Sequence, residues 1–437
     1  MSHQDVVIVG GGIVGCVLAK GLSEQAGLSV TLVDAASPSN AVSSSDKTSS
    51  TDVTSSSKAT STSKATSSSK ANSSSKANST FNPLTDTRVI ALARRTVNEL
   101  NAMGVGLAVL AKQSQGKIEH IEVSDKGGIG LTNLSCSEFG INTFGQVVSL
   151  SALTHNVMSQ SKQYQHIAPA TVTSLARETD STVVTLDNGS TINAKLLVIA
   201  DGGRSSLAQQ VGLTRHTNDY QQMAIIFNAH TSEPHHNKAY ERFTKNGPVA
   251  FLPFDSEING HVAKGKGFSV VWTVAKEHAE SLMQLSPGAF IHRLQQEFGY
   301  RQGQITAISE LASYPLALSY TDALTSHRAV VVGNAAQALH PIAGQGFNLG
   351  LRDIITLVNT LKGVSDPGEF NVLNEYATKR SKDRAATITL TDLLVRTFSN
   401  RHFPLVAARN LALTALNVMP SAKRAFVQQT TGYGRSA

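Results

Sequence analysis

The stretch that decides the fold is Asp5–Ala35, which reads DVVIVGGGIVGCVLAKGLSEQAGLSVTLVDA. An apolar run leads into a turn of three glycines, a helical pattern follows, and a second apolar run ends in Asp34. Two apolar strands joined by a glycine turn and a helix are typical of a βαβ unit that binds a dinucleotide. The stretch therefore predicts a parallel sheet with a nucleotide at the carboxyl end of its first strand.

The glycines and the acid have separate predicted roles in that unit. Gly10 permits a tight turn, Gly12 lets the backbone approach a pyrophosphate, and Gly15 lets the helix pack close to the strand. The first helical residues follow Gly12, so their amides attract phosphate; these residues are Ile13 and Val14. The carboxylate of Asp34, at the end of the second strand, is placed to accept hydrogen bonds from ribose hydroxyls.

Composition limits the classes of protein to consider. The chain has 437 residues, of which 41% are hydrophobic and 16% charged, enough for two or three domains with real cores. Its two cysteines cannot form a disulfide framework. The opening residues run directly into a strand, which predicts a cytoplasmic protein without a cleaved leader. No run of about eighteen apolar residues spans a membrane, and no basic block with interleaved aromatics predicts nucleic-acid binding.

A low-complexity tract, residues 43–80, interrupts the predicted nucleotide-binding domain. It repeats Ser, Thr, Lys, Ala and Asn without large apolar residues, and it contributes +3 to the net charge of +7, leaving +4 for the rest. Such a composition cannot bury enough apolar surface to order the chain. The tract is expected to lengthen a surface loop; a lysine-rich tether for a partner or a membrane face is the alternative.

Two later stretches have the same strand-then-glycine character. LLVIADGGRSSL is an apolar strand that ends in Asp201, and AVVVGNAAQALHPIAGQGFNLGLRD is a strand, a bent loop and a helix from about Leu349. Glycines at 344, 346 and 350 allow the backbone of the loop to approach a ligand closely. Amides at the start of the helix would stabilise negative charge on that ligand.

Together the three stretches resemble the fingerprints of the flavoprotein aromatic hydroxylases, the p-hydroxybenzoate hydroxylase group. YERFTKNGPVAFLPF, ASYPLAL and DRAATITLTDLL are similar to the ubiquinone-biosynthesis branch of that group, in particular to its 2-polyprenyl-6-methoxyphenol hydroxylases. The resemblance spans nearly the whole chain outside the tract. It implies a Rossmann-like FAD-binding domain, a β-sheet substrate domain and C-terminal helices, in an α/β (mixed α+β) fold.

The resemblance also implies roles for single residues. Arg88 would lie along the FAD pyrophosphate, Gln146 would bind the ribityl region, and Asp201 would serve both FAD and the nicotinamide. Asn334 stands where the wider group has Asp and would still accept a ribityl hydrogen bond. The backbone that faces the flavin pyrimidine edge would come from Gly346, Phe347 and Asn348, and Gly333, beside Asn334, is a further matched cofactor-binding position.

The implied reaction is hydroxylation of a polyprenylated methoxyphenol ring in ubiquinone biosynthesis. FAD would be bound, NAD(P)H and O2 would be co-substrates, and the oxygen donor would be a flavin C4a-hydroperoxide. A phenol ring is already electron-rich, so the protein must mainly exclude water and position the ring. Two alternatives stay open: a sister hydroxylase that attacks another ring carbon, and a non-catalytic scaffold that retains FAD.

The substrate side is predicted from strand texture. Between Gly212 and Tyr314 the sequence alternates as in a mostly antiparallel sheet, to which a hairpin within Lys117–Leu134 would contribute. Pro253 and Pro341 are expected to border the substrate pocket, and Phe251, Phe254 and Trp272 are expected to line a channel for a prenyl tail. The alternative is that these three aromatic residues form the sheet core.

Few other residues suggest chemistry. His340, beside Pro341, is a weak catalytic candidate, and a structural role in the turn is the alternative. His235 and His236 lie in a polar stretch without a spaced third ligand, so no metal site is predicted. The C-terminal pattern is flanked by Arg and Lys and suits either an interfacial helix at the inner face of a membrane or a helix packed on the FAD domain.

The predicted organisation is discontinuous. The FAD-binding domain takes residues 1–111, 146–213 and 314–390, and the substrate domain takes a hairpin at 112–145 and the sheet at 214–313. Residues 391–437 form a C-terminal helical segment. The expected partners are a small hydrophobic prenylated phenol and other ubiquinone-biosynthesis proteins, with no nucleic acid.

Overall fold

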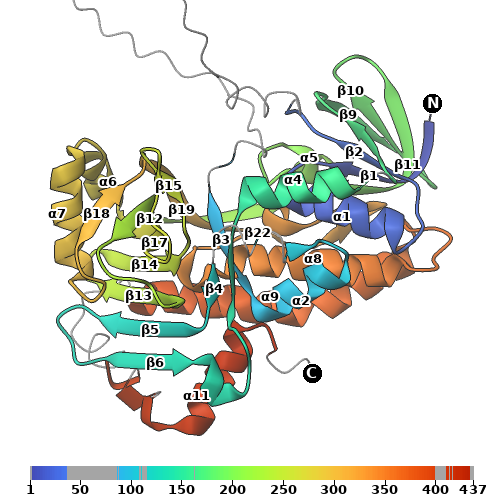
Figure 1. Ribbon diagram of the computed structural model, residues 1–437. Coiled ribbons are helices and arrows are strands. Elements are labelled where there is room, and N and C mark those ends of the chain that lie inside the picture. Colours follow the sequence, from blue (N-terminus) through green and yellow to red (C-terminus); the bar gives the residue numbers. More distant parts are fainter. Residues whose placement is uncertain are drawn as a thin grey trace, which may run out of the picture.

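Figure 1 shows the computed structural model of the chain, which has two large sheets with helices around them. The structure describes residues 2–36, 86, 88–107, 110, 116–161, 163–398, 410–412, 414–415 and 417–433. The low-complexity tract at 43–80 lies outside the described residues. The predicted mixed α/β class is confirmed.

The first sheet is built around the N-terminal strand. Apolar residues on both sides of this strand explain its central position, because strands of a parallel sheet are buried on both faces. Its order is β20-β21-β11-β1-β2-β8, and β9 and β10 extend β11 as an antiparallel hairpin. The strands are β1 (Ser2–Val9), β2 (Val30–Val33), β8 (Gln165–Ile167), β9 (Val172–Arg177), β10 (Thr182–Leu186), β11 (Thr191–Ile199), β20 (Thr325–Ser326) and β21 (Ala329–Val331).

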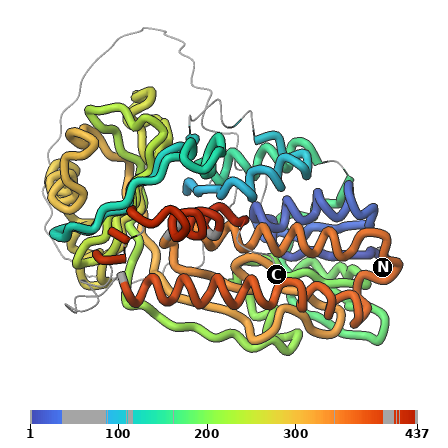
Figure 2. The backbone as a smooth tube through the Cα atoms, turned by 90° about the horizontal axis from the view of Figure 1, so that it is seen from below, coloured from blue at the N-terminus to red at the C-terminus, as the bar shows by residue number. Residues whose placement is uncertain are grey.

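Helices cover this sheet and bring distant parts of the chain together. Helix α1 packs against α4 and α8, and α8 packs against α9; Figure 2 shows the first helix in blue beside the orange helices of the last third of the chain. The helices are α1 (Ile13–Glu24), α2 (Arg94–Ala102), α4 (Leu150–Gln160), α5 (Leu207–Gln210), α8 (Gln345–Leu361) and α9 (Phe370–Phe398). The core of this half is one cluster of buried aliphatic side chains.

The second sheet has the order β22-β19-β12-β17-β14-β13-β5-β6, and β18 pairs with β12. It is antiparallel, as predicted, except between β13 and β5. The predicted hairpin is present as β5 and β6. The strands are β5 (His120–Asp125), β6 (Leu131–Ser135), β12 (Arg215–Thr231), β13 (Lys238–Thr244), β14 (Gly247–Pro253), β17 (Gly267–Ala275), β18 (Ile305–Ile308), β19 (Ala312–Thr321) and β22 (Gln337–Ala338).

Two helices cover one face of the second sheet, α6 (Lys276–Met283) and α7 (Pro287–Phe298), on the left in Figure 1. Because side chains of a strand alternate between faces, the other set of side chains points toward the first sheet. Smaller elements complete the structure. They are the sheet of β3 (Val89–Ala93), β4 (Lys117–Ile118) and β7 (Gly145–Ser149), the pair β15 (Glu257–Ile258) and β16 (His261–Val262), and the 3₁₀ turns η3 (Cys136–Phe139), η4 (Gly333–Ala335) and η5 (Ile342–Gly344).

The C-terminal segment includes α11 (Pro420–Thr430) and is tied to both halves. Lys423 pairs with Glu138 at 2.6 Å, and Asn410 donates to Asp125 at 2.7 Å. Arg95 of α2 donates to the carbonyl oxygen of Gly432 at 3.1 Å. Among the described residues, no helix has the length and hydrophobicity needed to cross a bilayer. The predicted domain boundaries stay a prediction.

Candidate active site

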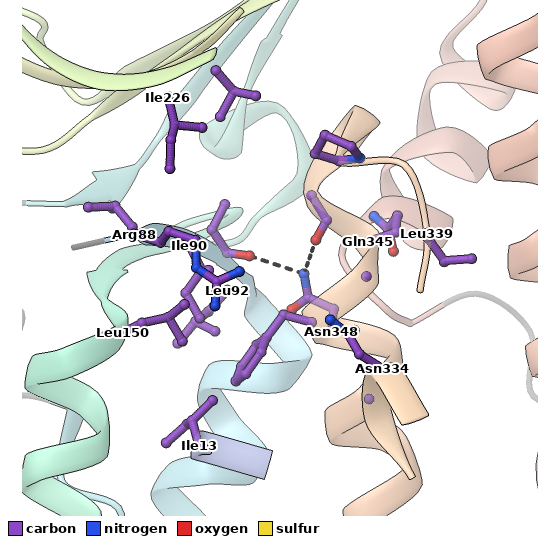
Figure 3. A pocket seen from close by; sticks show the side chains of 18 of the residues that line it. Ile13, Arg88, Ile90, Leu92, Leu150, Ile226, Asn334, Leu339, Gln345 and Asn348 are labelled. Atoms are coloured by element: carbon purple, nitrogen blue, oxygen red, sulfur yellow. Dashed lines mark hydrogen bonds between the residues drawn. The ribbon is translucent and has the colours of Figure 1, made fainter. Parts of the chain in front are cut away.

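A cavity of about 1830 Å³ lies between the two sheets. It is bordered by the glycine turn after β1, by β3, by the end of β11, by the loop between η4 and α8, and by one face of the second sheet. A pocket for one drug-sized ligand has about 300–1,000 Å³, so this cavity has room for a dinucleotide and a second molecule. Figure 3 shows part of it, with Ile226 of the second sheet across from Gln345 and Asn348 of α8.

The glycine turn forms one end of the cavity. Gly10 has φ +116°, and a Cβ there would lie 2.6 Å from the carbonyl oxygen of Ala200, so only glycine fits. A Cβ on Gly15 would collide with the carbonyl oxygen of Gly10, in keeping with its predicted packing role. A Cβ on Gly12 would meet open space, since this residue faces the cavity. The turn is thus packed against the backbone of Ala200 and of Gly10 itself on one side, and it is open toward the cavity at Gly12.

Helix α1 presents its N-terminus to that open space. No side chain caps it, and no acidic residue lies in its first turn. Uncapped amides at a helix start bind anions. The cavity residue Asp34 is half-buried at the end of β2. Burial raises the pKa of its carboxyl above the ordinary value, and hydrogen bonds from the backbone of Gly11 and Ala36 oppose this shift.

Two arginines also line the cavity. Arg88 forms a two-pronged pair with Asp86, in which Nε donates to Oδ1 at 2.9 Å and Nη2 donates to Oδ2 at 2.6 Å. Arg204 follows the end of β11; burial and the nearby Arg88 lower the pKa of its guanidinium. The cavity wall therefore carries two guanidinium groups, one of them paired with Asp86, and guanidinium groups suit a pyrophosphate.

The end of β11 is organised by Asp201. Its carboxylate accepts hydrogen bonds from the backbone of Gly203 at 2.8 Å and of Ser205 at 3.1 Å, which fixes the turn that carries Arg204. Arg215 holds the neighbouring loop, donating to the carbonyl oxygen of Asn334 at 3.0 Å. The side chain of Asn334 itself is exposed to the cavity.

The start of helix α8 also borders the cavity, again without a side-chain cap or an acidic first turn. Gly344 precedes it with φ +61°. Asn348 joins this helix to β3: its Nδ2 donates to the carbonyl oxygens of Ala91 at 3.1 Å and Gly344 at 2.7 Å, and its Oδ1 accepts from Ala93 at 2.8 Å (Figure 3). A second uncapped helix start thus faces the same space as α1.

The structure places most predicted cofactor residues on the cavity wall. They are Gly10, Gly12, Ile13, Val14, Asp34, Arg88, Asp201, Gly333, Asn334, Gly346, Phe347 and Asn348. Gln146 is absent from the wall, although its neighbours Gly145 and Leu92 belong to it. Its Nε2 is buried without a hydrogen-bond partner among the described residues. The assignment of each cavity-wall residue, and of Gln146, to a particular part of the cofactor stays a prediction.

The substrate-side prediction needs correction. Phe251 is fully buried on the helix-covered face of the second sheet, where its ring stacks on Phe298 with centroids 3.8 Å apart. The residues of β14 that face the cavity are the alternate ones, Pro248, Ala250 and Leu252. Pro253 shares the parity of Phe251 and is also absent from the wall. Apolar strand residues occur on both faces here, so sequence alone could not give the parity.

The other substrate-side predictions have different outcomes. Trp272 is 2% exposed and packs edge-on against Phe290 of α7, so it belongs to the sheet core. Pro341 does line the cavity, as expected. The sheet face contributes residues that the sequence did not single out, namely Ile226, Glu241, Ala250, Val271, Thr273 and Tyr314. Their period of two along adjacent strands was the available signal.

His340 does not act on this cavity. Its ring is fully buried, its Nδ1 accepts a hydrogen bond from the backbone of Ile342 at 3.1 Å, and it packs edge-on against Tyr220. Burial lowers the pKa of the imidazole to about 4, so the ring is neutral at ordinary pH. The neighbours Leu339 and Pro341 line the cavity, but His340 does not. The catalytic prediction is corrected in favour of the structural role in the turn.

The residues present fit FAD. Two uncapped helix starts, a glycine turn open toward the cavity and two arginines suit a dinucleotide with a pyrophosphate at one end and a flavin at the other. The unpartnered Nε2 of Gln146 is a buried donor close to the same wall. The apolar sheet face then remains for a second molecule.

Comparisons with known proteins agree with this fit. The FAD binding domain family matches residues 77–391, and the FAD dependent oxidoreductase family matches residues 5–103. The chain is 30% identical to the ubiquinone hydroxylase UbiL of Rhodospirillum rubrum, over 98% of this chain and 89% of that protein. It is 26% identical to the 3-demethoxyubiquinol 3-hydroxylase of Escherichia coli, over 99% of this chain and 100% of that protein.

Solved structures share the fold. One is p-nitrophenol 4-monooxygenase PnpA from Pseudomonas putida DLL-E4, with a TM-score of 0.72 and 17% identity over the full length of both chains. Another is HpxO of Klebsiella pneumoniae complexed with FAD and uric acid, with a TM-score of 0.67 and 14% identity over 99% of this chain and 96% of that chain.

Proposed function

Since the chain belongs to the FAD-binding flavoprotein aromatic hydroxylases, in their ubiquinone-biosynthesis group, we propose that it hydroxylates the ring of a polyprenylated methoxyphenol. The predicted family and cofactor are confirmed by these matches. The chain is an FAD-dependent aromatic-ring monooxygenase of the ubiquinone pathway. The substrate and the ring carbon are the parts proposed.

FAD, when bound and reduced by NAD(P)H, supplies the activation of O2 that ring hydroxylation requires. The residues of this chain position the two reactants. The amides at the start of α1, with Arg88 and Arg204, would hold the pyrophosphate, and the amides at the start of α8 would stabilise negative charge on the flavin edge. The sheet face opposite excludes water from the reacting atoms.

The observation that carries the proposal is the continuity of two unlike surfaces. The polar dinucleotide wall passes without a partition into an apolar wall formed by Ile226, Ala250, Leu252 and Val271. An apolar wall beside a flavin suits a hydrophobic aromatic ring more than a small charged one. The cavity continues to Phe426 of α11, and we assign this end to the prenyl tail.

A sister hydroxylase that attacks another ring carbon is the second candidate. It is favoured by the relatives, because one of them is named a 3-hydroxylase of demethoxyubiquinol. A scaffold that retains FAD without turnover gains no support from a cavity with room beyond the cofactor.

We further propose a cytoplasmic enzyme that meets its substrate at the inner face of the membrane and works beside other proteins of the pathway. Exposed apolar side chains of the C-terminal segment support membrane contact; they are Leu411, Val418 and Met419. The exposed basic residue Arg424 lies nearby on α11, and apolar side chains beside a basic one favour an anionic lipid surface.

The test uses the FAD-loaded enzyme, NADPH and a short-chain 2-prenyl-6-methoxyphenol under ¹⁸O-labelled oxygen, with products read by mass spectrometry. One labelled oxygen para to the phenol hydroxyl is the expected result. Labelling at another ring carbon selects the sister hydroxylase. NADPH oxidation that yields only hydrogen peroxide, with each of several prenyl phenols, would overturn the substrate class while leaving the flavoenzyme.

A further inference from the structure

Three glutamates line the cavity; Glu257 and Glu310 are exposed, and Glu241 is partly buried. Glu241 lies on β13, where Ala239, Glu241 and Phe243 line the cavity together with Tyr240, whose ring belongs to the helix-covered core. Glu241 is paired across the sheet with Ala250 on β14 and with Val123 on β5, and both of these also line the cavity. Its four nearest neighbours on this face are therefore apolar.

Two carboxylates near β13, Glu122 on β5 and Glu297 on α7, are compensated. Glu122 pairs with Lys238 at 2.7 Å and also with Arg301, and Glu297 pairs with Lys126 at 2.7 Å. In the part of the chain that the structure describes, Glu241 forms no ion pair. An unpaired carboxyl among apolar groups destabilises a fold, and such groups concentrate where chemistry is done.

The position of Glu241 is close to the flavin side. Phe243, two residues along the strand, belongs to a small buried cluster with Ile342 of η5, the turn before α8. The loop from Gly333 to Asn348 is called the flavin loop here. Two residues of a strand span roughly 7 Å, so Glu241 lies about that far along β13 from Phe243, whose side chain packs on this loop. Ala239, two residues the other way, belongs to a cluster with Val427 of α11. Glu241 thus stands between the flavin loop and the end of the cavity assigned to the prenyl tail.

We propose that Glu241 is the base of this site and accepts the phenolic proton of the bound substrate. The inference rests on the proposed function. The phenol O–H bond breaks, its electron pair stays on the oxygen and spreads into the ring, and the proton forms an O–H bond with a carboxylate oxygen of Glu241. The step is a proton transfer without oxidation or reduction. The ring of the resulting phenolate is a stronger nucleophile toward the oxygen donor.

The acid–base properties of Glu241 suit this role. Burial raises the pKa of its carboxyl to about 7, and no charged neighbour contributes to the shift. A base is most effective when its pKa is near the working pH. Other ionisable groups around Glu241 have hydrogen-bond partners of their own. Asp125 on β5 accepts from Asn410, and Asp392 on α9 accepts from Tyr220. Arg242 donates to the hydroxyl of Ser124 and to the backbone carbonyl oxygen of Glu297, and Tyr240 donates to Gln302. Tyr314 lines the cavity from β19.

The kinetic test compares the FAD-loaded wild type with Glu241→Gln, Glu241→Asp and Glu280→Gln, using 2-methoxyphenol and NADPH. Glu280 is an exposed carboxylate on α6, outside the cavity, and serves as the matched control. We expect Glu241→Gln to lower kcat for hydroxylation about 10²-fold at pH 7 with KM changed less than about threefold. Glu241→Asp should be intermediate, and the control should be unchanged.

The pH profile separates a base from a packing residue. Wild-type kcat should rise through about pH 7 as Glu241 loses its proton. Glu241→Gln should lose this step and regain rate only at alkaline pH, where the phenol ionises in solution near its own pKa of about 10. A variant that keeps kcat within twofold and keeps the step near pH 7 would overturn the proposal.

A binding measurement gives an answer that does not depend on turnover. A carboxylate that accepts the phenol hydrogen bond gains stability in its charged form, so binding should release protons. Titration calorimetry of the FAD-loaded enzyme with 2-methoxyphenol at pH 6.5, in buffers of different ionisation enthalpy, should show this release. It should be absent in Glu241→Gln and with 1,2-dimethoxybenzene, which lacks the hydroxyl group.

The two failures are distinguishable. Equal proton release in wild type and Glu241→Gln, or none in wild type, overturns the role of Glu241. Proton release that depends on Glu241, without hydroxylated product from any 2-methoxyphenol, supports Glu241 as the phenol-binding base and overturns the proposed substrate class.

Discussion

Substitution of Arg380 by Met should separate the flavin loop from the helix that anchors it. Arg380 of α9 donates from Nε to Asp353 of α8 at 2.8 Å, and the two side chains are 3% and 0% exposed. The other oxygen of Asp353 accepts from the backbone of Gly333 at 3.2 Å and from Gln337 at 2.6 Å. Removing the cation leaves Asp353 buried with two neutral donors and an uncompensated charge. Breaking a buried pair in this way costs about 3–5 kcal/mol of unfolding free energy.

The assay is urea denaturation followed by two probes. Flavin fluorescence reports release of the cofactor near Gly333, and the single tryptophan, Trp272, reports the second sheet. At about 1–3 kcal/mol per molar urea, the flavin transition of Arg380→Met should move down by at least about 1 M. The control is Lys379→Ala, whose partner Glu375 is half exposed, with an expected change below about 0.5 kcal/mol. Equal midpoints for both variants would refute the reasoning.

The remaining predictions concern the cavity walls. Gly12→Ala should leave the thermal midpoint nearly unchanged and weaken FAD binding, measured by fluorescence titration, because its Cβ would enter the open space; Gly15→Ala should instead destabilise the fold by collision with the backbone. Phe251→Ala should cost about 3–5 kcal/mol in denaturation without altering the position of ring hydroxylation, read by mass spectrometry. Ala250→Phe, on the opposite face of β14, should leave stability within about 1–3 kcal/mol and raise KM for the prenyl phenol. Folded Glu241 keeps a proton up to about pH 7 that the unfolded chain loses near 4.5, so wild-type stability should fall as pH rises from 5 to 8. Glu241→Gln should lack this fall and exceed wild type at pH 8 by at most about 3 kcal/mol, and equal pH dependence of the two proteins would contradict the shift.

Local sequence was sufficient for the dinucleotide side. The glycine turn and Asp34 are consecutive in one βαβ unit, and the loop from Gly333 to Asn348 carries its own glycines. In each case, the residues that meet the ligand are near in sequence and their backbone geometry restricts the choice of side chain. The pattern therefore led to the correct places on the cavity wall.

The substrate side could not be obtained in the same way. The wall formed by β12, β13, β14, β17 and β19 depends on which face of each strand turns inward, and a shift of one residue reverses that face. In β14 both Phe251 and Leu252 are apolar, so hydrophobicity did not separate them. Glu241 was overlooked because a glutamate in a polar-looking YERF segment resembles an exposed residue until its neighbours across the sheet are known.

The pairing of β1 has a consequence for synthesis of the protein. Val6 lies beside Leu196 in the sheet, and α1 packs on α8, which begins at Gln345. On a ribosome β1 can pair with β2 early, but its other neighbour, β11, is complete only after about two hundred residues have been made, and the loop before α8 follows still later. A chain cut short by a premature stop codon before α9 lacks the cation that compensates Asp353. We expect such truncated chains to bind no flavin, so that bound flavin distinguishes chains that have been translated through α9.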